Sequence, residues 1–214
     1  MIPEERNLMN LKRFIAFFAA LSLSFSVFAE DVAPDVMVKN VTNEVLEILR
    51  KDKDIQAGNA KKAQELVEAK VLPNFNFLRM TAQAVGKDWR QATPAQQKML
   101  ADEFRTLLVR TYSNALTAYK SQTVDFKPVK MAPTDTEVTV RTEIKQPGAK
   151  PIGISYDLEK GAAGWKVFDV VIADVSLVVS YRDQFRQEIS ANGIDGLIKL
   201  LQTKNKGGDA IAKK

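Results

Sequence analysis

The chemistry open to this chain is limited by its side chains, because its 214 residues include no histidine and no cysteine. Ser-His-Asp and Cys-His nucleophiles, zinc sites built on His or Cys, haem ligation and disulfide exchange all need those residues. Ser176 has no histidine to activate it and stands in no G-x-S-x-G motif. We therefore expect neither a nucleophilic triad nor a bound metal or cofactor.

Carboxylates are the remaining groups that could transfer protons. Asp157, Glu159 and Asp169 lie in stretches typical of β-strands, and paired acids can catalyse when burial separates their pKa values. A small cone-type α+β enzyme using these acids is therefore one hypothesis. However, Asp157 and Glu159 fall on the polar positions of an alternating pattern, which indicates the solvent face of a strand. We expect a binding protein and no enzyme.

The strands that would position these acids follow from residue alternation. Apolar residues recur at every second position in two consecutive stretches, and the turn-rich segments 146–151 and 160–164 follow them. In the last of these strand-like segments, 165–172, the residues of both faces are apolar, which predicts a strand that is central or covered on both faces. The pattern predicts an antiparallel four-stranded meander with strands at 124–126, 137–145, 152–159 and 165–172.

Segments in which apolar residues have helical spacing precede and follow the predicted strands in the sequence. Thr93-Pro94-Ala95-Gln96 is a capping box that begins the longest helix. Gly86 and Asn192-Gly193 are expected to end helices, because glycine adopts a positive φ without penalty. Helices packed on one face of a meander define an α+β domain with an apolar layer between them. The expected helices span 38–49, 59–71, 75–85, 94–120, 181–189 and 194–201.

Residues 1–29 have the features of a cleaved secretion signal. Lys12 and Arg13 form a basic head, the fifteen residues Phe14 to Phe28 are an apolar run, and Val27-Phe28-Ala29 resembles a cleavage site. The run is shorter than the roughly 20 residues that span a bilayer, which disfavours an uncleaved anchor. We expect export to a bacterial periplasm, a single domain over 30–203 and a disordered basic tail over 204–214.

The charge pattern narrows the class of partner. Removing residues 1–29 removes three basic and two acidic side chains, which leaves 28 basic and 24 acidic ones and a net charge of +4. The lysines and arginines are dispersed and do not alternate with aromatic residues, so we expect no nucleic-acid partner. Mild attraction to anionic membranes is compatible with this pattern, although ordinary solvated surface is the simpler explanation.

Several segments together are similar to one known family, in the same order along the chain. They are Val71-Leu72-Pro73-Asn74-Phe75-Asn76-Phe77, Gly86-Lys87-Asp88-Trp89-Arg90, Phe104 to Tyr112, and Val175 to Phe185 followed by Gly193-Ile194-Asp195-Gly196-Leu197. These segments resemble the MlaC (toluene-tolerance) family of periplasmic phospholipid-binding proteins. Two positions depart from the family pattern. Relatives often have Asp at the position of Asn76, and Gly is expected at the position of Asp174. Asp tolerates left-handed geometry, so the expected bend at Asp174 can survive.

The resemblance implies a monomeric, soluble phospholipid carrier that maintains outer-membrane lipid asymmetry. Such a carrier holds acyl chains in an apolar pocket between sheet and helices. It passes lipid between an outer-membrane complex of a lipoprotein and a porin and an inner-membrane ABC transporter. An envelope adaptor without a pocket stays an alternative, because apolar stripes are also typical of ordinary core. The candidate lipid-binding residues are Phe104, Leu108, Tyr112, Val138, Val140, Ile154, Tyr156, Val170, Ile172, Val175 and Leu177.

Overall fold

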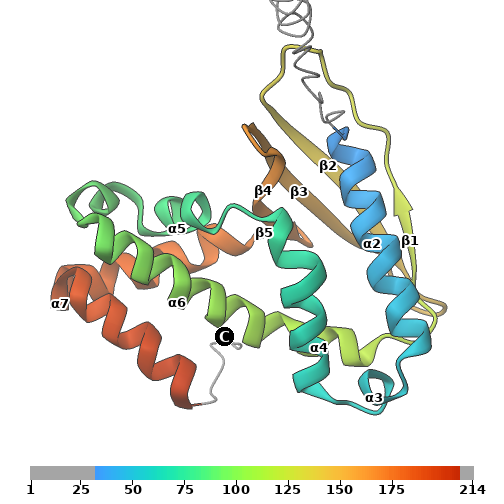
Figure 1. Ribbon diagram of the computed structural model, residues 1–214, viewed down its shortest axis with the longest axis horizontal. Coiled ribbons are helices and arrows are strands. Elements are labelled where there is room, and N and C mark those ends of the chain that lie inside the picture. The colour runs from blue at the N-terminus through green and yellow to red at the C-terminus, as the bar shows by residue number, and fades with distance from the viewer. Residues whose placement is uncertain (1–31, 208–214) are drawn as a thin grey trace, which may run out of the picture. The chain divides into compact units, whose positions relative to one another are not determined.

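A meander of five antiparallel strands forms the centre of the computed structural model, which describes residues 32–207 (Figure 1). The α+β class and the meander are confirmed. The sequence did not predict the fifth strand, because two residues are too short to show alternation. The strands are β1 Thr123–Phe126, β2 Glu137–Lys145, β3 Ile152–Gly161, β4 Gly164–Ile172 and β5 Val175–Ser176.

The helices divide into two groups around the sheet. Helix α2 runs along one face of the sheet, whereas α5, α6 and α7 pack together at the β4 side (Figure 1). The α-helices are α2 Pro34–Lys51, α3 Lys53–Gln56, α4 Ala60–Leu66, α5 Phe77–Val85, α6 Pro94–Tyr112 and α7 Leu177–Gly207. A π-helical turn, η1 Val67–Val71, and the 3-10 turns η2 Leu72–Asn74, η3 Gly86–Gln91 and η4 Ser113–Ala118 connect them.

Two predicted helices differ from the observed ones at their ends. The helix expected over 94–120 is α-helical only to Tyr112 and tightens into η4. The helix expected over 59–71 changes from α4 to the π-helical turn η1. Both changes occur in segments that line a cavity described below.

Helix α7 spans both predicted C-terminal helices. A kink at Gly193, with φ of 71°, separates its two halves at the position expected for a cap. The helix continues to Gly207, so the basic tail predicted from residue 204 begins within a helix. The reason is tertiary, since Leu201 is buried and the Asn205 amide donates hydrogen bonds to the main-chain and side-chain oxygens of Glu103. The predicted secretion signal and the rest of the predicted tail lie outside the described residues.

Strand β4 separates two hydrophobic cores, as its two-sided apolar pattern predicted. Its pairing with β3 shifts by one residue, because Asp157 pairs with Asp169 but Leu158 pairs with Val167. Phe168 is the extra residue of this β-bulge and packs with α5, α6 and α7, while Val167 packs on the opposite side with α2.

A buried carboxylate fastens β4 to α7. Asp169 is 7% exposed and accepts hydrogen bonds from the main-chain N–H of Val178 and from the hydroxyl of Ser176. The chain turns between them at Ala173 and Asp174, whose φ angles are 48° and 66°. The left-handed bend expected at Asp174 is therefore present without glycine.

The helical core contains an aromatic cluster. Phe104 is fully buried and packs edge-on against Tyr181 and Phe185, with ring centroids 5.1 and 5.2 Å apart. Tyr181 is hydrogen-bonded to Tyr112, and burial raises the pKa of Tyr181 to about 12. The hydroxyl of Tyr181 is thus held protonated inside the core.

The capping box gives a first test of the fold. The Thr93 hydroxyl accepts from the Gln96 N–H and the Gln96 side chain accepts from the Thr93 N–H. Thr93→Ala should lower the free energy of unfolding by about 1 kcal/mol. Thr106→Ala, in the exposed middle of α6, should change it by less than about 0.5 kcal/mol. Urea titration followed by circular dichroism measures both, and equal effects would contradict the cap.

The aromatic cluster gives a second test. Tyr181 binds its proton more tightly in the folded than in the unfolded chain, so its contribution to stability is present below about pH 10 and lost as the pH rises towards 12. The thermal midpoint of the wild type should fall more steeply between pH 10 and 12 than that of Tyr181→Phe. Tyr119→Phe serves as the matched control. A wild-type slope that Tyr181→Phe leaves unchanged would argue against this assignment.

Candidate functional site

A cavity of about 450 Å³ lies between the sheet and α2. Its wall includes seven residues of α2 and eight residues of the sheet, and no described charged side chain lines it. From α2 come Met37, Val38, Val41, Thr42, Val45, Leu46 and Leu49, and from the sheet Val124, Thr142, Ile144, Ile152, Ile154, Tyr156, Val167 and Ile172. The end of α6 adds Tyr112, and the connecting segments add Val71, Asn74, Phe75, Ala115, Leu116, Ala118, Tyr119, Gln122 and Gln146.

The periods of the two elements explain why their apolar side chains meet. Successive side chains of a strand point to opposite faces, so Thr142, Ile144 and Ile154 share the face towards α2. On α2, residues three and four apart form one stripe, which runs from Val38 to Leu49. Each pattern is visible in the sequence, but only the fold brings the stripe onto this face of the sheet.

The cavity lies beside a stretch of α2 that is flanked by two packed residues. Val38 packs with the sheet, and Leu49 packs with α3 and α4. Val41 and Thr42, between them, are only partly buried, and their side chains border empty space. Protein interiors are normally filled to the density of organic crystals. A void of this size is therefore a feature that ordinary core packing does not explain.

The mouth of the cavity lies between η4 and the turn that joins β2 to β3. Tyr112 and Ile152 are 38% and 46% exposed, and Ala115, Ala118 and Gln146 are also exposed. Along β3, Tyr156 is four residues farther in than Ile152, which corresponds to about 13 Å. The inner end is bordered by the buried side chains of Val38 and Val167, the latter only 2% exposed.

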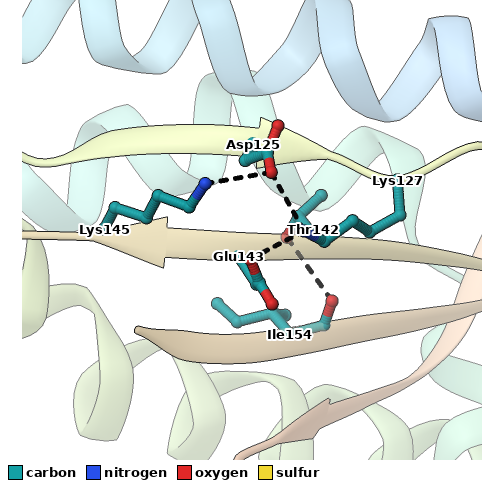
Figure 2. Close-up of polar contacts among 6 residues, drawn as sticks. All are labelled: Asp125, Lys127, Thr142, Glu143, Lys145 and Ile154. Atoms are coloured by element: carbon teal, nitrogen blue, oxygen red, sulfur yellow. Dashed lines mark hydrogen bonds and ion pairs between the residues drawn. The ribbon is translucent and has the colours of Figure 1, made fainter. Parts of the chain in front are cut away.

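Two of the hydroxyl groups in the wall belong to the sheet, on Thr142 and Tyr156. Thr142 is buried and its hydroxyl donates to the main-chain oxygen of Ile154 at 3.4 Å (Figure 2). Burial raises the pKa of Tyr156, and a hydrogen bond with Thr142 partly opposes this rise. Tyr156 is therefore a neutral hydroxyl, suited to hydrogen bonding rather than to acid–base chemistry.

The structure divides the eleven residues proposed from the sequence into three groups. Tyr112, Ile154, Tyr156 and Ile172 line the cavity. Phe104 and Leu108 lie in the helical core, because that face of α6 turns towards α5 and α7. The other five lie elsewhere around the sheet: Val138, Val140, Val170 and Leu177 pack in the core beside the cavity, and Val175 is 57% exposed.

Sequence reasoning overlooked α2 as a wall of the cavity. Its apolar stripe predicts a helix that packs on the sheet, and a helix that lines a cavity needs the same stripe. Val124, Ile144 and Ile152 were also missed, although their alternation placed them on the same face as Ile154. Periodicity identifies the apolar face of an element but not whether a neighbour fills the space beside it.

The strand acids considered for catalysis have structural partners. Asp157 accepts from the Thr139 hydroxyl at 2.6 Å, and Glu159 pairs with Arg79. Asp169 holds the start of α7, as described above. None of the three lines the cavity. Within residues 32–207 there is no cluster of three or more acids suited to a metal ion, and no helix there has the length and apolar character needed to cross a bilayer.

Comparison with known proteins gives consistent matches. In sequence, the chain is 25% identical over 208 residues to the intermembrane phospholipid transport system binding protein MlaC of Haemophilus influenzae, covering 92% of this chain and 94% of that protein. It is 29% identical over 106 residues, about half of each chain, to the toluene tolerance protein ttg2D of Pseudomonas putida.

In structure, the chain resembles the phospholipid-binding protein from Ralstonia solanacearum, solved in complex with a phospholipid. The TM-score is 0.75 with 38% sequence identity, covering 81% of this chain and 97% of that one. The model of the MlaC protein family matches residues 39–203, which include most of α2, the whole sheet and most of α7. The chain therefore belongs to the MlaC family.

Proposed function

We propose that this protein is a periplasmic phospholipid carrier that holds acyl chains in the cavity between α2 and the sheet. The observation that carries the proposal is an unfilled, uncharged cavity with an open mouth. A head group would remain at the mouth in water, since the wall contains no charged side chain to bind it. The complex of the related Ralstonia solanacearum protein with a phospholipid supports this ligand class.

The length of the cavity supports acyl chains as its occupants. Val38 and Leu49 lie about 17 Å apart along α2, at 1.5 Å of rise per residue. One leaflet of a bilayer provides about 15 Å of hydrocarbon, half of the core thickness. A lipid tail of membrane length would therefore reach from the mouth to the inner end.

Energetics define what such a carrier can do by itself. Sheltering two sixteen-carbon chains from water is worth on the order of 25 kcal/mol at roughly 0.8 kcal/mol per CH₂, beyond the roughly 18–21 kcal/mol at which non-covalent affinities saturate. Loss of lipid into water is therefore negligible. A bilayer shelters the chains equally well, so exchange with a membrane is nearly neutral. Direction must come from partners, for which we propose an outer-membrane complex and an inner-membrane ABC transporter.

The proposal assigns no catalytic role to the chain. The strand acids are engaged in the fold and lie away from the cavity. Export through the predicted secretion signal would deliver the protein to the compartment between the two membranes. A ligand held only by apolar contacts and hydroxyl groups needs no reactive side chain.

Native mass spectrometry of protein purified without added lipid tests the proposal. We expect a complex whose mass exceeds that of the chain by one or more phospholipids. Val41→Trp fills the middle of the cavity and should reduce bound lipid several-fold while the protein stays folded. Val36→Trp is the matched control on the same helix, because Val36 is 43% exposed and does not line the cavity. Lipid-free wild type, or equal lipid in both variants, would refute the proposal.

A larger side chain at Leu108 distinguishes core from cavity. Because Leu108 is 6% exposed within the helical core, Leu108→Trp should lower the free energy of unfolding by about 1–3 kcal/mol. The folded fraction should keep its bound lipid. If Leu108→Trp instead lost lipid without losing stability, Leu108 would belong to the binding site. Chemical denaturation and lipid analysis of the same sample separate the two results.

A further inference from the structure

Tyr119 connects the wall of the cavity to a cation outside it. Its side chain lines the cavity, and its hydroxyl oxygen accepts a hydrogen bond from Nε of Arg50 at 3.0 Å. Arg50 belongs to the last turn of α2, is exposed and lies outside the wall. The hydrogen bond therefore holds a guanidinium group in water directly beside a side chain that borders the cavity.

The same residue lies at the mouth of the cavity. Tyr119 directly follows Ala118, an exposed residue of the wall. Three residues farther along, Gln122 donates to the side chain of Gln146, which belongs to the turn that joins β2 to β3, at 3.1 Å. The two segments that border the mouth thus meet close to Tyr119. The head group of a lipid whose chains fill the cavity would emerge beside Arg50.

Most hydrogen-bond donors of this pair are free. A guanidinium group has five N–H donors and no acceptor, and only the Nε donor of Arg50 is used. The Tyr119 hydroxyl accepts this bond and keeps its own hydrogen to donate. Within residues 32–207, neither that hydrogen nor the terminal amino groups of Arg50 have an acceptor. Several donors on one cationic pair are suited to binding an anion.

No carboxylate already neutralises Arg50. None lies within 4.0 Å of its guanidinium in the described part of the chain. The carboxylates nearest to it along the chain have other partners, which are Glu47 with Lys51 and both Asp52 and Asp54 with Lys62. The planar fork of a guanidinium matches two oxygens of a phosphate, which a carboxylate partner would otherwise displace.

We propose that Arg50 and Tyr119 bind the phosphate of the lipid head group at the mouth of the cavity. The inference rests on the proposed function, because it needs acyl chains in the cavity. The terminal amino groups of Arg50 donate to two phosphate oxygens, and the Tyr119 hydroxyl donates to the same group. Since every phospholipid carries this phosphate, the pair selects phospholipids over uncharged lipids and does not choose among head groups.

Competitive loading of the full chain tests this selection. The donor vesicles consist of dioleoyl phosphatidylcholine, whose phosphate is its only negative charge, with dioleoylglycerol as the minor component. Native mass spectrometry then gives the ratio of bound phospholipid to bound dioleoylglycerol. Arg50→Gln should lower this ratio about three- to tenfold relative to the wild type, with total bound lipid unchanged. Tyr119→Phe keeps the ring and should give an intermediate ratio.

A matched control separates the proposed contact from general electrostatics. Lys53→Gln removes the same charge three residues from Arg50, at an exposed side chain outside the cavity wall, and should keep the wild-type ratio. A ratio that Arg50→Gln leaves unchanged, or that Lys53→Gln lowers equally, would overturn the inference. Failure of the proposed function gives a different result, because neither lipid would then be bound.

Inorganic phosphate distinguishes a lipid phosphate from the free ion. Added in excess over the lipid, it should leave the ratio unchanged, since the free ion has no chains to hold it at the mouth. If inorganic phosphate abolished the preference for phospholipid, the pair would be a site for the free anion and the assignment to the head group would be wrong.

Discussion

The β-bulge at Phe168 is the feature on which the arrangement of this protein depends. In a regular strand, successive side chains alternate between the two faces, so Val167 and Val170, three residues apart, would point to opposite faces. The extra residue shifts the register, so that Phe168 joins the helical core while Val167 and Val170 both serve the α2 side. The guanidinium of Arg79 lies 3.5 Å from the Phe168 ring centroid and pairs with Glu137 and Glu159. Strand β4, helix α5 and the ion pairs of Arg79 therefore meet at Phe168.

This arrangement separates the filled core from the cavity proposed to hold lipid. The helical core of Phe104, Tyr181 and Phe185 is filled, and Asp169 ties its α7 to the sheet. The opposite face of the sheet carries a second, incompletely filled layer under α2. An empty apolar volume reduces stability, because its lining loses dispersion contacts. A filled core elsewhere in the same unit allows the fold to tolerate that loss.

The sequence predicted the elements better than it predicted the site. Alternation located four strands, and Thr93, Gly86 and Gly193 marked helix ends where the structure has them. The candidate site was less accurate, because Phe104 and Leu108 have the same apolar spacing as the residues of α2. A stripe shows that a helix buries one face but not which element covers it. Long-range packing determines that the apolar face of α6 packs in the helical core and that the apolar face of α2 lines the cavity.

The sequence by itself determined which side-chain types this protein lacks, the class of its fold and, through its motifs, its family. Those properties depend on residue types and on short-range spacing, which are complete in the linear chain. Tertiary structure alone decided where space remains, which residues border it and that Arg50 meets Tyr119. These depend on the distances from α2 to the sheet and to the end of η4, and no local pattern encodes the separation of two elements.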